Sequence, residues 1–187
     1  MMIIKLWAKS WNINDAKYST LSSYTLTLMV LSYLQCGTNP PVLPALHQMN
    51  PHLFNNNSNL FQLPFKRESL PQFQSQNWQS LASLVLGFFQ FYNNFDFMAF
   101  CGSVRTGTLL RIDDCYNYSK ELRDNPRQWE AYICMEEPFG RSNTGRAVIK
   151  RDKFDEILYA LRATHYKIAK YPCLECLWNS CRNTNHN

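Results

Sequence analysis

Hydrophobic residues recur at helical spacing at the start of the chain. Between residues 3 and 11 they fall three and four positions apart, so this segment should form an amphipathic helix. Lys5 and Lys9 are four residues apart and therefore share one face of that helix. Two ammonium groups on one face can converge on a single anion, although two lysines on a solvated helix face are also common.

A second helix should follow over residues 19–35. Ser19 or Thr20 can cap its start, and a glycine followed by two prolines ends it. Ser23 and Tyr24 lie in its first turns, where unpaired backbone N–H groups and the helix dipole favour a phosphate. A tyrosine ring can also stack on a nucleobase, which contributes roughly 1–3 kcal/mol.

Further regular patterns predict a mainly α-helical fold with a few short β-strands. Ser80 should cap a core helix with hydrophobic residues at i, i+3, i+4 and i+7, and a last helix should begin near Asp152. Short strands or extended segments are expected between these helices, over residues 98–104, 109–112 and 129–135.

Residues 36–79 differ from the rest in composition. They hold six of the nine prolines, seven asparagines and six glutamines. We expect a long, partly disordered insert here, between N-terminal helices over 1–35 and a domain over 80–170. A cysteine-containing tail follows over 171–187. The side chains expected to tether the insert are Leu43, Leu46, Leu53 and Phe54.

Charge is unevenly distributed along the chain. Residues 1–140 hold ten basic and ten acidic residues, whereas residues 141–187 hold nine basic and four acidic ones. A basic C-terminal quarter suggests an anionic partner, with nucleic acid the leading candidate and a solvated helix face the alternative. Lys150, Arg151 and Lys153, at the start of the last helix, could contact RNA. The chain shows no signal peptide and no apolar run long enough for a membrane span, and its seven scattered cysteines suit a reduced compartment, the cytoplasm or else the nucleus.

A pair of acidic residues, Glu136 and Glu137, ends an apolar run just before a proline turn. A carboxylate placed there can accept hydrogen bonds from the edge of a base. Asn143 and Arg146 could pin the turn to the body of the protein or reach a substrate. A turn tied by a Glu–Arg pair is the alternative interpretation.

Four motifs occur in a specific order: K-x-W-A-K, T-L-S-S-Y, L-G-F-F-Q-F-Y and Y-I-C-M-E-E-P-F…N-T-G-R-A-V. Together they resemble the central domain, including the PAP-associated region, of the noncanonical poly(A) polymerases and terminal uridylyltransferases. The resemblance implies the helical central domain of a DNA polymerase beta-like nucleotidyltransferase. It further implies that Lys5, Lys9 and Ser23 contact a triphosphate, that Tyr24 stacks on the base, and that Glu137 reads the base.

Two departures from the family pattern favour ATP. Uridylyltransferases usually have a second acidic residue after P-F and a nearby histidine, but Gly140 takes the first place and no histidine lies between Pro138 and Arg146. This form looks more like the poly(A) polymerases of the germline-development type. The alternatives are a uridylyltransferase specificity domain and a non-catalytic module that binds RNA or a protein partner.

The carboxylate trio that holds two metal ions in this family is not found in the chain. Gly102-Ser103 followed by Asp113-Asp114 has nearly the right interval, but two adjacent aspartates on a strand would point to opposite faces. We therefore expect no catalytic residue in this chain. We expect it to be a fragment that is inactive alone, and we expect only the full enzyme to need Mg²⁺ or Mn²⁺. The expected partners are an RNA 3′ end, a nucleoside triphosphate and an RNA-binding adaptor protein.

The tail contains a C-x2-C-x4-C-x4-H array. Its members, Cys173, Cys176, Cys181 and His186, have the spacing of a zinc knuckle with the last two ligand types exchanged. A zinc site, and a zinc-dependent adaptor function, are therefore a further hypothesis.

Overall fold

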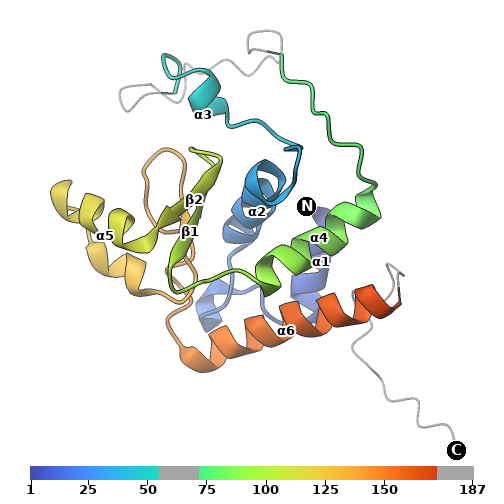
Figure 1. Cartoon of the computed structure of the whole chain (residues 1–187). Coiled ribbons are helices and arrows are strands. Elements are labelled where there is room, and N and C mark those ends of the chain that lie inside the picture. The colour runs from blue at the N-terminus through green and yellow to red at the C-terminus, as the bar shows by residue number, and fades with distance from the viewer. Residues whose placement is uncertain (55–71, 172–187) are drawn as a thin grey trace, which may run out of the picture.

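The computed structural model describes residues 1–54 and 72–171. A three-stranded sheet lies between α5 on one side and α2 on the other, while α4 lies beyond α2 and packs against α6, which runs below (Figure 1). The helices are α1 (Met2–Ser10), α2 (Ser23–Ser32), α3 (Leu46–Met49), α4 (Leu81–Asn93), α5 (Ile112–Glu121) and α6 (Arg151–Lys170). The strands are β1 (Phe100–Ser103), β2 (Thr108–Arg111) and β3 (Met135–Glu136).

The main hydrophobic core joins α1, α2, α4 and α6. The Trp7 ring of α1 packs edge-on against Phe89 of α4, with 4.9 Å between ring centroids. Its indole N–H donates to the Thr164 hydroxyl of α6 at 2.8 Å. Tyr92 of α4 donates to the carbonyl of Met29 in α2, also at 2.8 Å. These bonds satisfy buried polar groups and fix the four helices relative to one another.

The sheet order is β2-β1-β3, with β1 and β2 antiparallel and β1 and β3 parallel. Gly102 of β1 permits the close approach of α2, because a Cβ at this position would lie 2.8 Å from the Ser32 hydroxyl and 2.7 Å from Met135 Cε. Parallel pairing with β1 directs β3 toward the same end of the sheet as the hairpin turn. The chain leaves β3 there and enters the acidic turn.

A second, smaller core lies between the sheet and α5. It contains Cys101, Cys115, Trp129 and Cys134. Burial raises the pKa of the Cys134 thiol to about 12 and that of Cys101 well above its usual value. The thiols are therefore protonated at neutral pH, and none of the cysteines in the described ranges forms a disulfide.

Most of the predicted elements are present, including the Ser80 cap, whose hydroxyl accepts the Ser83 N–H at 3.1 Å. The predicted start of the second helix is wrong. Ser22 is the cap, because its hydroxyl accepts the Thr25 N–H at 2.9 Å, while Thr20 instead bonds the backbone of Asp15. Residues 129–135 include the end of a 3₁₀ helix (Pro126–Glu130) and strand only from Met135.

Helix α5 was not predicted. The sequence pattern predicts a strand around the aspartate pair, but Asp113 and Asp114 lie in the first turn of this helix, where the helix dipole stabilises acids. The argument from opposite strand faces is therefore wrong for these two residues. Residues 55–71 of the expected insert lie outside the described part of the chain, as do Cys173, Cys176, Cys181 and His186. No helix within residues 1–54 and 72–171 has the length and apolarity to cross a membrane.

Candidate nucleotide site

The N-terminus of α2 and the turn after β3 meet, although they are more than a hundred residues apart in sequence. The Tyr24 hydroxyl donates to Glu137 Oε1 at 3.0 Å. One residue along, the Thr25 hydroxyl donates to the carbonyl of Thr144 at 2.8 Å. These two bonds fix the start of α2 against both arms of the turn.

Glu137 organises the turn as well as bonding Tyr24. Its Oε2 accepts the backbone N–H of Phe139, at 2.9 Å, and that of Gly140. Its own N–H donates to the carbonyl of Ser142 at 2.8 Å. The carboxylate is thus held in one orientation at the surface, which suits a group that must present an acceptor to a ligand.

Tyr24 combines an accessible ring with a fixed hydroxyl. The side chain is 48% exposed, so one part of the ring is free to stack on a ligand. Partial burial, together with the charge and the hydrogen bond of Glu137, raises the pKa of Tyr24 to about 12. The phenol therefore stays protonated at neutral pH and continues to donate to Glu137.

Asn143 holds the turn against the body of the protein, which is one of the two roles expected for it; the other was contact with a substrate. It is fully buried, and its Oδ1 accepts the N–H groups of Met135 and Gly145 at 3.0 and 2.8 Å. Its Nδ2 donates to the carbonyl of Gln128 at 2.7 Å. Arg146, the other residue considered for this task, is exposed.

The two adjacent glutamates have different tasks. Glu136 is buried, pairs with the Arg105 guanidinium at 2.8 Å and accepts a hydrogen bond from the Ser103 hydroxyl. Glu136 is the last residue of β3 and Glu137 is the first residue after it, and adjacent side chains of an extended chain point to opposite sides. The sequence alone does not identify Arg105 and Ser103 as partners of Glu136. The alternation of faces was the available signal that only one of the two acids could reach the surface turn.

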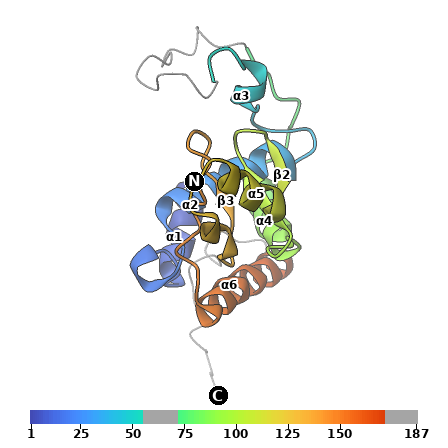
Figure 2. The ribbon, with the colours of Figure 1, turned by 90° about the vertical axis from the view of Figure 1, so that its left-hand side faces the viewer.

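The remaining predicted residues lie on α1 and at the start of α2. Lys5 and Lys9 are exposed on α1, which packs against α2, as α2 packs against β3 (Figure 2). Neither lysine pairs with a carboxylate of the described residues. Ser23 is the first residue of α2, and its hydroxyl donates to Asn14 Oδ1 at 3.3 Å. The structure joins Tyr24 directly to Glu137 and carries the two lysines on the neighbouring helix.

The residues expected to contact RNA lie at the start of α6. Lys150 is exposed just before the helix, whereas Arg151 bonds Asp155 at 3.0 Å and Lys153 bonds Glu156 at 2.7 Å. Both pairs are at the surface, so they contribute little and can exchange for a phosphate.

A metal site would need carboxylates gathered in one place. Within the two described ranges no group of three or more His, Cys, Asp or Glu residues could hold a metal ion. Asp113 and Asp114 are both exposed, and Asp113 lies 3.5 Å from the Arg111 guanidinium. The described carboxylates therefore do not fit a two-metal centre.

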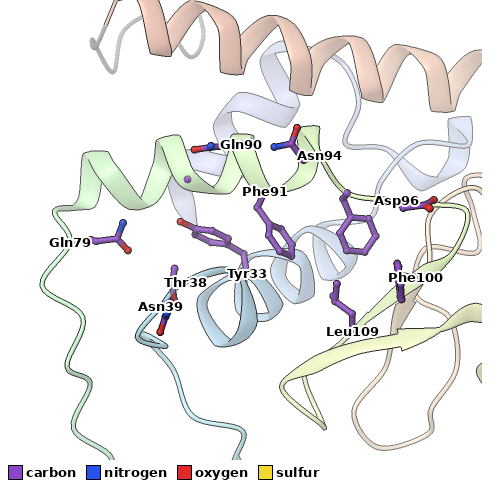
Figure 3. A pocket seen from close by; sticks show the side chains of 13 residues that line it. Tyr33, Thr38, Asn39, Gln79, Gln90, Phe91, Asn94, Asp96, Phe100 and Leu109 are labelled. Carbon is purple, nitrogen blue, oxygen red and sulfur yellow. The ribbon is translucent and has the colours of Figure 1, made fainter.

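A separate cavity of about 580 Å³ lies between α4, the π-helical turn after α2 (Tyr33–Gly37) and the β1–β2 hairpin (Figure 3). Aromatic rings and amide side chains line it, among them Tyr33, Phe91, Gln90 and Asn94. None of the five predicted nucleotide-site residues lines this cavity, so the two features are distinct.

Comparison with known proteins identifies the relatives of the chain. Residues 80–143 match the family described as Cid1 family poly A polymerase. The chain is 38% identical over 168 residues to the poly(A) RNA polymerase gld-2 homolog A of Drosophila melanogaster, a match that spans 89% of this chain and 12% of that protein. It is 41% identical over 167 residues to the poly(A) RNA polymerase GLD2 of Danio rerio, which spans 88% of this chain and 32% of that one.

Solved structures give the same assignment and confirm the predicted fold class. A GLD-2/RNP-8 complex matches with a TM-score of 0.69 and 27% identity, over 95% of this chain and 51% of that one. The Cid1 poly(U) polymerase bound to Mg 3′-dATP matches with a TM-score of 0.74 and 28% identity, over 96% and 54%. The chain is thus homologous to part of the GLD2 poly(A) RNA polymerases, and its residues 80–143 are a PAP-associated domain of the Cid1 poly A polymerase family, as the order of its motifs predicted.

Proposed function

We propose that this chain supplies the nucleotide-binding wall of an RNA 3′-terminal nucleotidyltransferase that extends RNA with AMP from ATP. The observation that carries the proposal is the half-exposed Tyr24 ring, whose hydroxyl is fixed by Glu137. A base stacked on that ring would lie beside a carboxylate that can only accept hydrogen bonds. Such an acceptor suits the exocyclic amino group of adenine, and the curated relatives named above are poly(A) RNA polymerases.

The phosphates of the same nucleotide would extend toward α1. Ser23 and Tyr24 lie in the first turn of α2, whose backbone N–H groups have no acceptor within the helix. The adjacent helix supplies the ammonium groups of Lys5 and Lys9. Charge-assisted hydrogen bonds of this kind are stronger than neutral ones, so the two lysines and Ser23 would provide most of the affinity for the triphosphate.

The chemical step needs groups that the described residues do not provide. Mg²⁺ or Mn²⁺ would supply activation of the 3′ hydroxyl and neutralisation of the leaving pyrophosphate, but no described carboxylate cluster fits these ions. This chain would therefore bind and orient the nucleotide, while Lys150, Arg151 and Lys153 would contact the RNA.

A protein partner and a cytoplasmic location are part of the same proposal. Two of the similar solved structures support them, a GLD-2/RNP-8 complex and a cytoplasmic RNA terminal U-transferase. The partner would be an adaptor protein that recruits the RNA.

Nucleotide titration tests the proposal. Isothermal titration calorimetry of the chain should show saturable binding of ATP, tighter than that of UTP. A Lys5→Ala/Lys9→Ala variant should bind ATP at least about tenfold more weakly, since each charged hydrogen bond contributes about 1.5–3 kcal/mol. Lys17→Ala, an exposed lysine between the same two helices, should bind ATP within about twofold of the wild type. Absence of ATP binding by the wild type would refute the proposal, and tighter binding of UTP would reassign it to a uridylyltransferase.

Primer extension tests the assignment of the chemical step. The purified chain, given an RNA primer, ATP and magnesium, should add no nucleotides, because it lacks a described carboxylate cluster for the metal ions. The control is a reaction in which a polymerase of known activity extends the same primer. Robust tailing by the chain would show that its own residues complete the active site.

A further inference from the structure

Residues 42–54, which include α3, form a strap that is fastened to the π-helical turn after α2 (Tyr33–Gly37) and lies against the hairpin. The N–H groups of Val42 and Leu43 both donate to the carbonyl of Leu34, at 2.8 and 3.1 Å. The side-chain amide of Gln35, itself buried, donates to the carbonyls of Pro44 at 2.8 Å and Val104 at 3.2 Å. Hydrogen bonds therefore attach the strap to Leu34 and Gln35, and Gln35 also bonds the hairpin.

A close contact with the hairpin turn adds to these bonds. Gly107, at φ 64°, faces Ala45 so closely that a Cβ on the glycine would lie 2.7 Å from the alanine Cβ. Only glycine meets both the left-handed backbone and the small space at this position. With this contact in place, α3 lies next to the tip of the hairpin and the tip of the loop that follows β3 (Figures 1 and 2).

His47 extends from α3 onto the acidic turn. Its imidazole lies beside the backbone of Pro138. Its ring lies 5.4 Å from the ring of Phe139 and 4.7 Å from that of Phe54. His47 thus contacts the two residues that directly follow Glu137.

Charged groups from two elements face the imidazole. These are Arg105 of the hairpin and Glu136 and Glu137 at the end of β3. Burial, followed by the Arg105 guanidinium, lowers the pKa of His47 below its usual 6.5, so the ring is neutral at pH 7. A neutral imidazole can pack on the Phe139 ring without placing a second cation beside Arg105.

We propose that His47 is a positioning residue for base recognition. The strap, through the contacts of His47 with Pro138 and Phe139, holds the exposed turn so that Glu137 meets both Tyr24 and the base. This inference rests on the proposed nucleotide site. None of the described contacts joins the strap to Lys5, Lys9 or Ser23. His47 should therefore affect binding of the base and not of the phosphates.

Two ligands separate these effects. ATP uses both halves of the site, whereas inorganic tripolyphosphate uses only the phosphate half. His47→Ala should bind ATP about five- to tenfold more weakly, because the turn loses the packing of the imidazole on Phe139, and should bind tripolyphosphate like the wild type. His47→Phe, which keeps an aromatic ring against Phe139, should recover most of the ATP affinity. His165→Ala, a half-buried histidine on α6, should leave both affinities unchanged.

The possible failures are distinguishable. If Tyr24→Ala weakens ATP binding but His47→Ala does not, the role of His47 is refuted and the proposed function stands. Equal losses of ATP and tripolyphosphate in both His47 variants would mean general damage, and would also refute it. If the wild type binds no ATP, the proposed function and this inference both fail.

Discussion

Replacing Glu136 by alanine should lower the free energy of unfolding by about 3 kcal/mol. Removal of one partner of a buried ion pair typically costs about 3–5 kcal/mol, because the other charge stays behind without compensation. The Glu136 side chain is 4% exposed, but that of Arg105 is 22% exposed, which places the expected loss at the lower end of this range. The loss of the acceptor also leaves the fully buried Ser103 hydroxyl without this partner. Urea denaturation measures the change as a shift of the midpoint at an unchanged slope.

Two control variants distinguish the ion pair from the loss of any glutamate. Glu121→Ala removes an exposed glutamate at the end of α5 and should change the stability by less than about 0.5 kcal/mol. An Arg105→Met/Glu136→Met double variant should lose less than the sum of its single variants, because it leaves no unpaired charge. A Glu136→Ala protein that unfolds at the wild-type midpoint would show that the pair contributes nothing to stability.

The elements that the sequence predicted well are those with a long hydrophobic pattern. Helices α4 and α6 bury residues at i, i+3, i+4 and i+7 spacing, so their presence and their buried faces follow from periodicity alone. Helix α5 lacks this signal. Only Cys115 and Ser119 are buried within it, and its polar residues resemble those of a loop. The site residues Tyr24 and Glu137 could be chosen because an ordered set of motifs named them, whereas neither alone is distinctive.

Contacts between distant segments could not be predicted in this way. Glu136 and Glu137 are adjacent in the sequence, but the burial of Glu136 depends on Arg105. Arg105 lies in the turn between β1 and β2, 31 residues away. In the same way, His47 lies in a segment expected to be a loosely tethered insert, and its position over Pro138 depends on bonds from Gln35 and a close approach at Gly107. Periodicity and composition describe one segment at a time, so they do not contain such pairings.

Replacing Tyr24 by alanine should weaken ATP binding by about tenfold or more. Stacking of a base on an aromatic ring contributes roughly 1–3 kcal/mol, and each 1.4 kcal/mol corresponds to a factor of ten in affinity. The ring is half exposed and is not part of the hydrophobic core, so the variant should remain folded. Calorimetric titration with ATP measures the loss, and titration with tripolyphosphate should show little change because the ring does not contact phosphate.

Tyr24→Phe separates the ring from its hydroxyl. It keeps the stacking surface and loses only the bond to Glu137 Oε1, so ATP affinity should fall by no more than about fivefold. Tyr166→Ala, which removes a tyrosine of α6 that is 69% exposed, controls for the loss of an aromatic surface residue and should bind ATP like the wild type. If Tyr24→Ala binds ATP as tightly as Tyr166→Ala, then the base does not stack on this ring. The nucleotide site would in that case have to lie elsewhere on the chain, with the bond between Tyr24 and Glu137 serving only to hold the turn against α2.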